Sequence, residues 1–321
     1  MKTILLGFEE DNLSAAAVAQ IQTLAPGYQV LVTTDRATIE QRLNEIEIVF
    51  KSFPTDLIAQ APNLRWLQQW GAGVDGLMGR PEIVALEHLT ITTGSGIHAV
   101  PITEHIFGFL LAFGRGIHRA VRNQAHKQWQ SPTWDQLFEL PGKTMVLIGV
   151  GAIGERTAQI ATALGMRVLG VRRDPTVAAA GVEAMYSPDQ LLALLPQADF
   201  VVLTVPLTPA THQLIGEREL RAMKSTAYLV NIGRGATVDE AALIRALQEG
   251  WIAGAGLDVC AVEPLPATSP LWSMENVIIT AHYAGATPLY GARAMPIFLD
   301  NLKRYLAGQP LQNVVDKQLG Y

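Results

Sequence analysis

The sequence predicts an α/β protein with two lobes, each built on a parallel β-sheet. Strand-like and helix-like segments alternate from one end of the chain to the other, which is typical of parallel sheets. From residue 140 onwards the strand-like runs are continuously apolar, as expected for strands that helices cover on both faces. A chain of 321 residues is long enough for two domains of about 150 residues each.

The elements fall into two series, and hydrophobic periodicity predicts each of them. In the first third of the chain we expect helices at Asn12–Leu24 and Ala37–Leu43, and strands at Thr3–Phe8, Tyr28–Val32, Ile46–Phe50 and Trp66–Trp70. The second series has strands at Thr144–Gly149, Arg167–Val171, Phe200–Val205, Tyr228–Asn231, Gly254–Asp258 and Val277–Thr280. Two such series in one chain predict two lobes with a cleft between them.

Between the two series, Ile102–Val121 predicts a helix that is apolar on more than one side. A helix of this kind is buried on several sides. Two interpretations stay open for it. It is either a core helix, or a helix that crosses between the lobes and also meets a partner subunit.

The composition excludes several classes of protein. The chain is 49% hydrophobic and 17% charged, which predicts a large interior rather than extended disorder. A net charge of -5 gives no basic surface for nucleic acid. No uncharged apolar stretch reaches the ~20 residues of a membrane helix, and a single cysteine, Cys260, fits a reducing compartment. We therefore expect a soluble, cytoplasmic protein with neither nucleic-acid nor membrane partners.

A glycine-rich motif follows the first strand of the second series. It reads Gly149-Val150-Gly151-Ala152-Ile153-Gly154 and leads into a helical run, Arg156–Leu164. Between a strand and a helix this G-x-G-x-x-G spacing predicts a dinucleotide site. The first glycine permits the tight turn, the second lets the backbone approach a pyrophosphate, and the third lets the helix pack close to the strand. Backbone N–H groups at the helix start would hold the anion.

The next strand, Arg167–Val171, indicates which dinucleotide binds. A 2′-hydroxyl is usually held by an acidic residue about 20 residues after the glycine motif. Here Arg172 and Arg173 stand at that place, with Asp174 after them. Two guanidinium groups favour the 2′-phosphate of NADP. NAD stays possible, with Asp174 reaching the ribose and both arginines in solvent.

Polar residues follow three later strands, where an open α/β sheet binds its ligands. Arg234 stands on a glycine-flanked turn, Asp258 ends the next strand with Glu263 close behind it, and His282 follows the last strand. Further motifs accompany them: Asn63-Leu64-Arg65-Trp66, Gly71-Ala72-Gly73-Val74-Asp75, Thr204-Val205-Pro206-Leu207-Thr208, Asn231-Ile232-Gly233-Arg234-Gly235, Leu257-Asp258-Val259 and Glu263-Pro264.

In this order the motifs cover most of the chain, and the sequence closely resembles the D-isomer-specific 2-hydroxyacid dehydrogenases. That family includes glyoxylate/hydroxypyruvate reductases and 3-phosphoglycerate dehydrogenases. The resemblance implies a two-lobed α/β fold in which a Rossmann dinucleotide-binding domain (99–288) is inserted into a flavodoxin-like substrate domain. The substrate domain is then discontinuous, made from residues 1–98 and 289–321. We expect no regulatory domain of the kind found in many 3-phosphoglycerate dehydrogenases, which would argue against that substrate.

The resemblance also implies a reaction, the NAD(P)H-dependent reduction of a 2-keto acid to a D-2-hydroxy acid and its reverse. Hydride passes between nicotinamide C4 and substrate C2. Three residues are the expected catalytic set. Arg234 would bind the carboxylate and carbonyl oxygens, His282 would act as the acid and base, and Glu263 would orient the imidazole.

Residues outside this set have expected binding roles. The Gly71–Val74 turn resembles a loop whose N–H groups hold the substrate carboxylate, so we expect Ala72, Gly73 and Val74 to bind substrate together with Arg234 and His282. The expected cofactor-binding residues are Gly149, Gly151, Ala152, Ile153, Gly154, Arg172, Arg173, Val205, Pro206, Thr211, Ile232, Gly233, Arg234, Asp258, His282 and Gly285. Within this set Asp258 resembles the residue that contacts the nicotinamide carboxamide.

Several points stay open at this stage. The other six histidines show no metal-ligand spacing, so we expect no metal site. Thr103 either faces the nicotinamide or is a buried helix hydroxyl. The aromatic residues Tyr283, Trp129 and Trp134 either line a pocket or belong to packing or interface surfaces. A homodimer is the family expectation. The alternative functions are a non-catalytic dinucleotide sensor or co-repressor-like scaffold, and a formate or phosphite dehydrogenase-like enzyme.

Overall fold

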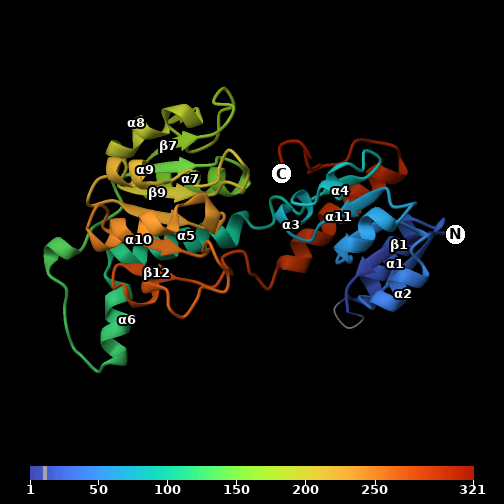
Figure 1. Cartoon of the computed structure of the whole chain (residues 1–321), viewed down its shortest axis with the longest axis horizontal. Helices are drawn as coiled ribbons and strands as arrows, with labels where there is room; N and C mark the ends of the chain where they lie inside the picture. Colours follow the sequence, from blue (N-terminus) through green and yellow to red (C-terminus); the bar gives the residue numbers. More distant parts are fainter. Residues whose placement is uncertain (10–12) are drawn as a thin grey trace. The chain divides into compact units, whose positions relative to one another are not determined.

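The predicted strands form two separate parallel sheets in the computed structural model, which describes residues 1–9 and 13–321. The expected helix start at Asn12 lies outside these residues. The chain divides into two units (Figure 1). Unit 1 comprises Met1–Ile97 and Thr287–Tyr321, and unit 2 comprises His98–Ala286. The expected domain boundaries differ from these by one or two residues, and the role of unit 1 as substrate domain stays a prediction.

Unit 1 contains a five-stranded parallel sheet with the strand order β2-β1-β3-β4-β5. The strands are β1 (Lys2–Gly7), β2 (Tyr28–Val32), β3 (Ile46–Lys51), β4 (Trp66–Gln68) and β5 (Thr90–Thr92). The helices are α1 (Ala15–Leu24), α2 (Arg36–Gln41), the 3-10 helix η2 (Thr55–Gln60), α3 (Asp75–Met78), α4 (Pro81–Val84) and α11 (Tyr290–Leu306).

The C-terminal helix α11 belongs to unit 1 because its apolar face completes one of that unit's two cores. Phe298 is fully buried and stacks on Phe50 of β3 with ring centroids 4.1 Å apart. It also stacks on Trp66 of β4 at 5.4 Å, while Tyr305 covers the same indole at 5.5 Å. These rings cover one face of the sheet, and Leu5 with Val49 points to the core on the other face.

Unit 2 contains a seven-stranded parallel sheet with the order β12-β11-β10-β9-β6-β7-β8. The strands are β6 (Thr144–Ile148), β7 (Arg167–Val171), β8 (Ala184–Tyr186), β9 (Phe200–Leu203), β10 (Tyr228–Asn231), β11 (Gly254–Leu257) and β12 (Val277–Ile279). The α-helices are α5 (Ala99–Gly114), α6 (Ile117–Ala125), α7 (Ala152–Ala163), α8 (Leu191–Leu194), α9 (Glu217–Ala222) and α10 (Glu240–Gln248). Short 3-10 helices are η3 (Trp134–Gln136), η4 (Pro188–Gln190), η5 (Leu195–Gln197), η6 (Gly235–Thr237) and η7 (Pro270–Ser273).

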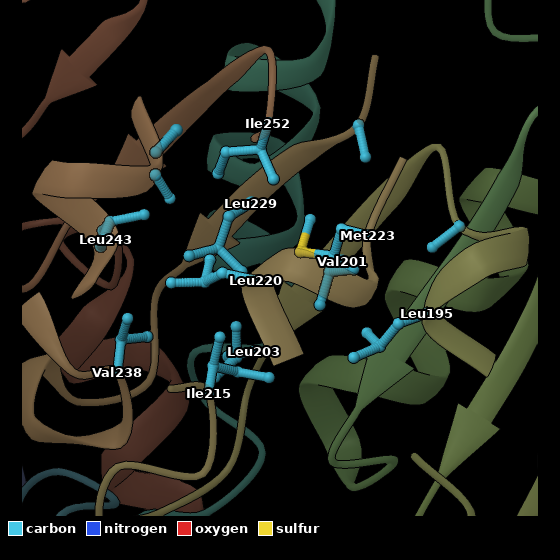
Figure 2. Packing of buried hydrophobic residues seen from close by; sticks show 14 of the residues in the cluster. Leu195, Val201, Leu203, Ile215, Leu220, Met223, Leu229, Val238, Leu243 and Ile252 are labelled. Carbon is cyan, nitrogen blue, oxygen red and sulfur yellow. The ribbon is translucent and has the colours of Figure 1, made fainter. Parts of the chain in front are cut away.

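Both faces of the unit 2 sheet are buried, which explains the continuous apolar runs. Successive side chains of a strand point to opposite faces. Accordingly, Val146 and Ile148 of β6 join one core and Met145 and Leu147 join the other. Side chains of β9 and β10 and of the helices that cover them contribute to the first core (Figure 2). The second core includes the apolar side chains of α5.

The strand orders confirm the predicted fold class. The order in unit 1 is the flavodoxin-like order 2-1-3-4-5. Unit 2 has the Rossmann order 3-2-1-4-5-6, counted from β6 as the first strand, with β12 added at one edge. Ligands of such sheets bind outside the carboxyl ends of the strands. Among the described residues, no helix is both long and apolar enough to cross a lipid bilayer.

Three details of the sequence prediction were wrong. The helix expected at Ile102–Val121 is two helices, because Gly116 has a φ of 65° and ends the hydrogen-bond ladder of α5. Strands β5 and β8 were not predicted, since each has only three residues and no strong apolar pattern. Several predicted strands also ran one or two residues too far, as at Trp66–Trp70, where β4 stops at Gln68.

Candidate active site

The glycine-rich turn lies between β6 and α7 and has the geometry of an anion cradle. Gly149 has a φ of 97°, which favours glycine. A Cβ on Gly154 would lie 2.3 Å from the carbonyl oxygen of Gly149, so only glycine lets α7 pack this close to the turn. A Cβ on Gly151 would meet nothing within 4 Å, and no side chain caps the first turn of α7. The turn therefore offers open space in front of helix N–H groups, which fits a dinucleotide pyrophosphate.

Asp174, the acidic residue that follows β7, forms hydrogen bonds within its own turn. Oδ1 of Asp174 accepts hydrogen bonds from Thr176, from the backbone N at 3.0 Å and from Oγ1 at 2.5 Å. These bonds hold the pKa of the Asp174 carboxyl below its usual range. Arg172 is half-buried, and its guanidinium donates a long 3.4 Å bond to the carbonyl of Val177. The group best placed for a ribose substituent here is therefore a cation.

Several expected cofactor residues lie at neighbouring strand ends of unit 2. Cβ positions on Gly149 and Gly233 would lie 2.8 Å and 2.6 Å from atoms of Val205, so the segments after β6, β9 and β10 are adjacent. Ile232 is buried beside Gly233. Thr211 is turned inward on its own loop, because its hydroxyl donates to the carbonyl of Pro206 at 2.7 Å. Ala152 and Ile153 are the first two residues of α7.

His282 and Glu263 form a hydrogen-bonded pair. Nδ1 of His282 lies 2.7 Å from Oε2 of Glu263, and the imidazole side chain is 49% exposed. The other carboxylate oxygen of Glu263 accepts the backbone N–H of Cys260 at 3.0 Å. This second bond fixes the carboxylate, which in turn fixes the ring. The nitrogen left for a substrate is Nε2.

The backbone of His282 has an unusual conformation with a φ of 54°. Non-glycine residues seldom adopt this left-handed region, and those that do often serve a function. Asp258 holds the conformation in place. Its carbonyl accepts the N–H of His282 at 2.8 Å, and its carboxylate accepts the N–H groups of Tyr283 at 3.1 Å and Ala284 at 3.0 Å.

The Asp258 side chain is 2% exposed and belongs to a further network. Thr280 Oγ1 donates to its Oδ1 at 2.6 Å, and Nε2 of His105 lies 2.8 Å from that hydroxyl. The expected contact of Asp258 with the nicotinamide carboxamide stays a prediction. In unit 2 the carboxylate oxygens are engaged by the segment 280–284.

Arg234 stands on a turn that Asn231 and Gly235 shape. Asn231 is buried, and its amide donates to the carbonyl of Arg234 at 3.0 Å while it accepts the N–H of Gly233 at 3.0 Å. A Cβ on Gly235 would lie 1.9 Å from backbone atoms of Cys260, so the turn packs directly on the segment that leads to Glu263. Burial and the nearby Arg234 guanidinium lower the pKa of His98. A Cβ on Gly285 would lie 2.9 Å from the His98 ring, which places Gly285 near the same turn.

The expected substrate turn lies in unit 1, after β4. Ala72 and Gly73 are exposed, and Val74 is buried and precedes α3. The other expected site residues lie in unit 2.

Sequence reasoning missed two members of the network behind His282. His105 showed no ligand spacing, and Thr280 was treated only as the end of a strand. The only available signal was the place of Thr280 two residues before His282. Thr103 is buried, and its hydroxyl lies 3.1 Å from that of Thr157 on α7, which favours its interpretation as a buried helix hydroxyl.

The fold and the glycine-rich turn define a dinucleotide-binding α/β protein with a histidine–carboxylate pair at the carboxyl edge of its sheet. Residues 107–284, more than half of the chain, match the family model described as "D-isomer specific 2-hydroxyacid dehydrogenase, NAD binding domain". The glyoxylate reductase of Korarchaeum cryptofilum (strain OPF8) is 34% identical over 281 residues, which cover 85% of this chain and 82% of that one.

Two solved structures are also similar. A D-isomer specific 2-hydroxyacid dehydrogenase from Xanthobacter autotrophicus Py2, in complex with NADPH and MES, has a TM-score of 0.84 at 30% identity and covers 100% of this chain and 99% of its own. An NADPH-dependent glyoxylate/hydroxypyruvate reductase from Sinorhizobium meliloti, in complex with NADP and sulfate, has a TM-score of 0.83 at 26% identity, with 100% of both chains covered. The chain belongs to the D-isomer-specific 2-hydroxyacid dehydrogenase family. It is an oxidoreductase that interconverts 2-keto and 2-hydroxy acids with a nicotinamide dinucleotide.

Proposed function

We propose that this chain reduces a small 2-keto acid of the glyoxylate and hydroxypyruvate class to the D-2-hydroxy acid, with NADPH as the preferred reductant. The observation that carries the proposal is the 2.7 Å pair of His282 and Glu263 at the edge of a dinucleotide-binding sheet. The turn of Arg234 packs on the segment that leads to Glu263. The relatives from K. cryptofilum and S. meliloti, a glyoxylate reductase and a glyoxylate/hydroxypyruvate reductase, support this substrate class.

The catalytic residues divide the chemistry between them. When bound, the reduced dinucleotide supplies the hydride. Arg234 binds the carboxylate and polarises the carbonyl, because its charged planar fork matches two oxygens. His282 gives the proton on Nε2 to the carbonyl oxygen, so the carbonyl group gains one hydride and one proton and becomes an alcohol. Glu263 accepts the Nδ1–H bond and stabilises the charged imidazole before the transfer.

The turn after β4 supplies the remaining substrate contact in this proposal. Ala72 and Gly73 are exposed at the carboxyl end of a parallel strand, and Val74 anchors the turn from below. Ligands of such sheets bind at this edge. Backbone N–H groups of the turn would hold the substrate carboxylate. Unit 1 thereby acts as the substrate domain and unit 2 as the dinucleotide domain.

Two observations support NADPH over NADH. Asp174, the acidic residue that could hold a 2′-hydroxyl, is bonded to Thr176. Arg172 stands in the expected acidic position with a weakly engaged guanidinium, and Arg173 follows it. A 2′-phosphate would gain charge-assisted bonds from these side chains. The X. autotrophicus structure is a complex with NADPH and the S. meliloti structure a complex with NADP.

The other functions considered are less well supported. A non-catalytic scaffold has no use for an imidazole whose ring is fixed by a carboxylate that is itself fixed by Cys260. A formate or phosphite dehydrogenase needs no proton donor for a carbonyl oxygen. Turnover of formate or phosphite in preference to any 2-keto acid would favour that alternative.

We also propose that the protein is a cytoplasmic homodimer. The arm, defined as residues 115–137, carries Trp129 at 102% and Trp134 at 96% relative exposure. Exposed tryptophans of this kind are typical of interface surfaces. Cys260 is free and buried, and burial raises its thiol pKa to about 11. An unpaired, protonated thiol fits a reducing compartment.

The substrate and cofactor are tested by steady-state kinetics with glyoxylate, hydroxypyruvate, pyruvate and phenylpyruvate, each with NADPH and NADH. We expect kcat/KM to favour NADPH and the two smallest keto acids. Arg172→Ala should lower kcat/KM for NADPH about 10- to 100-fold, the effect of losing a charge-assisted bond, and change it little for NADH. Arg167→Ala is the matched control, since this arginine starts the same strand and pairs with Glu183. A clear preference for NADH, unaffected by Arg172→Ala, would refute the cofactor assignment.

A further inference from the structure

A series of hydrogen bonds supports the segment around His282 and takes no direct part in the proposed reaction. It runs from His105 on α5 to Thr280, the residue after β12, and on to Asp258 after β11. The three residues are 22 to 175 positions apart in the sequence. The series ends at the residue whose backbone and carboxylate hold the segment 282–284.

We propose that His105 is a positioning residue for the acid–base step: it acts through Thr280 and Asp258 to hold His282 in its left-handed conformation. This inference rests on the proposed role of His282. It adds to that role a residue that acts through Thr280 and Asp258.

The direction of each hydrogen bond follows from the donors and acceptors available. Two backbone N–H groups already donate to the Asp258 carboxylate, one to each oxygen, so the carboxylate acts as an acceptor. The single hydroxyl proton of Thr280 therefore points to Asp258. The Thr280 oxygen can then only accept from His105, which must carry its proton on Nε2.

The residues around His105 hold its ring in the orientation that the hydrogen bond to Thr280 needs. The ring lies edge-on to Phe109 at 4.7 Å and to Tyr283 at 5.6 Å, and its side chain is largely buried. Burial lowers the pKa of His105, although Asp258, 3.8 Å away, opposes the shift. A neutral ring has one N–H, and the network assigns it to Nε2.

The backbone of His282 needs this support because its conformation is strained. A φ of 54° is strained for a residue with a Cβ and persists only where its surroundings determine it. The Asp258 carboxylate supplies part of that determination through the N–H groups of Tyr283 and Ala284. Without His105, the Thr280 hydroxyl keeps only its bond to Asp258, so the Asp258 carboxylate is positioned less tightly.

The first test is a kinetic double-mutant cycle with glyoxylate and NADPH. We expect His105→Leu to lower kcat about tenfold, as for loss of one buried hydrogen bond, and to leave KM for NADPH within about twofold. His105→Gln, whose amide N–H can reach the same hydroxyl, should restore most of kcat. In a Thr280→Val background, His105→Leu should cost almost nothing more, because coupled residues are not additive.

The matched control is His118→Leu. His118 is a half-buried histidine on α6 whose Nδ1 lies 2.9 Å from a backbone carbonyl, and it lies outside the network. This variant should keep wild-type kcat. Wild-type kcat in His105→Leu, failure of His105→Gln to rescue, or multiplicative losses in the cycle would each overturn the proposal.

The second test does not depend on turnover or on the leucine variant folding. In 15N-histidine-labelled protein, with the His105 signal assigned by its loss in His105→Gln, NMR should show a neutral ring protonated on Nε2 at pH 7. A ring protonated on Nδ1 alone would reverse the bond to Thr280 and overturn the proposal. If the wild-type protein reduces no 2-keto acid, the proposed function fails, and the NMR result still decides the network.

Discussion

At the scale of single residues, His282 shows how a polar site is assembled from strand ends. Its ring depends on Glu263, and its backbone depends on Asp258. These contacts come from the two loops that follow β11 and β12. No single segment of sequence contains the arrangement, and parallel pairing of the strands brings it together.

Substitutions of Glu263 and His282 should lower kcat to different degrees. His282→Ala should lower kcat roughly 10²- to 10⁴-fold, because a positioned acid–base group contributes that much. Glu263→Gln keeps the side-chain shape but removes the charge that supports the imidazolium, so kcat should fall about tenfold or more with little change in KM for NADPH. Steady-state kinetics of both variants and of the double variant measures this. Near-normal turnover in His282→Ala would exclude the assigned role.

A second residue, Glu47, makes the stability of unit 1 depend on pH. It is buried and receives Lys2 Nζ at 2.8 Å, the Tyr28 hydroxyl at 2.5 Å and the Tyr305 hydroxyl at 3.0 Å. Burial alone would raise the pKa of this carboxyl, but these bonds outweigh burial and lower the pKa. A depressed pKa adds stability above the unfolded-state value of about 4.3, and this stability is lost as pH falls through the folded-state pKa.

We therefore expect Glu47→Gln to lower the free energy of unfolding by about 1–3 kcal/mol at pH 7. The difference from wild type should shrink as pH falls below the unfolded-state value of about 4.3, because the wild-type carboxyl is then protonated in the unfolded chain and, at still lower pH, in the folded protein. Urea unfolding at pH 7 and at pH 3.5 measures both values. Glu45→Gln, at an exposed carboxylate paired with Arg42, is the control and should cost less. An equal loss at both pH values would contradict the linkage.

At the scale of elements, the turn between β6 and α7 separates two roles of glycine. A Cβ on Gly154 would overlap the Gly149 carbonyl, whereas a Cβ on Gly151 would enter open space. Gly154 is thus needed for packing, whereas Gly151 leaves room for the proposed dinucleotide.

The two alanine variants of this turn should accordingly behave differently. Gly151→Ala should keep the wild-type Tm but weaken NADPH binding by about tenfold or more, because the methyl group stands where the pyrophosphate approaches. Gly154→Ala should lower Tm as well, because the contact with backbone can only be relieved by moving α7. Thermal unfolding without dinucleotide, together with NADPH titration by fluorescence, distinguishes the two. A Tm loss in Gly151→Ala equal to that in Gly154→Ala would contradict this separation.

The elements also show what could be predicted from sequence and what could not. Strands buried on both faces, such as β7 and β10, were predicted to the residue because an unbroken apolar run marks them. The break between α5 and α6 was missed because apolar residues continue past Gly116. Arg234, Glu263 and His282 could be located from strand ends and family motifs. His105 could not, because only the packing of α5 beside β12 gives it a partner.

At the scale of the whole molecule, the arm is the part of unit 2 whose conformation is least explained by the packing of that unit. Its two ends are joined where Phe138 donates to the carbonyl of Gly114 at 3.0 Å, and Arg122 fixes α6 to the carbonyl of Val277 at 2.7 Å. Between these anchors, α6 and the segment after it extend away from the sheet of unit 2 (Figure 1). The arm is therefore held in place while its two tryptophans stay uncovered.

The proposed homodimer would place a second copy of the chain on this surface. The arm carries four Arg or Lys and one acidic residue, Asp135, whereas the whole chain has a net charge of -5. Another copy thus offers a surface of opposite average charge, and two exposed indoles supply the apolar anchors that stable interfaces use. A dimer would cover both arms at once, as two-fold symmetry requires.

We expect sedimentation equilibrium at micromolar concentration to give twice the chain mass of 34.8 kDa. Replacing both Trp129 and Trp134 by serine should shift the protein to the monomer mass, because truncating central aromatic anchors commonly costs 2 kcal/mol or more of binding free energy, about thirtyfold or more in Kd. Trp272→Ser is the matched control, since this indole is also exposed but lies on η7 and donates to the carbonyl of Pro266. A monomeric wild type, or a double variant that stays dimeric, would show that the arm serves another purpose. Because the glycine-rich turn and Arg172 lie within one unit 2, a monomeric variant should still bind NADPH, and its titration separates loss of assembly from loss of fold.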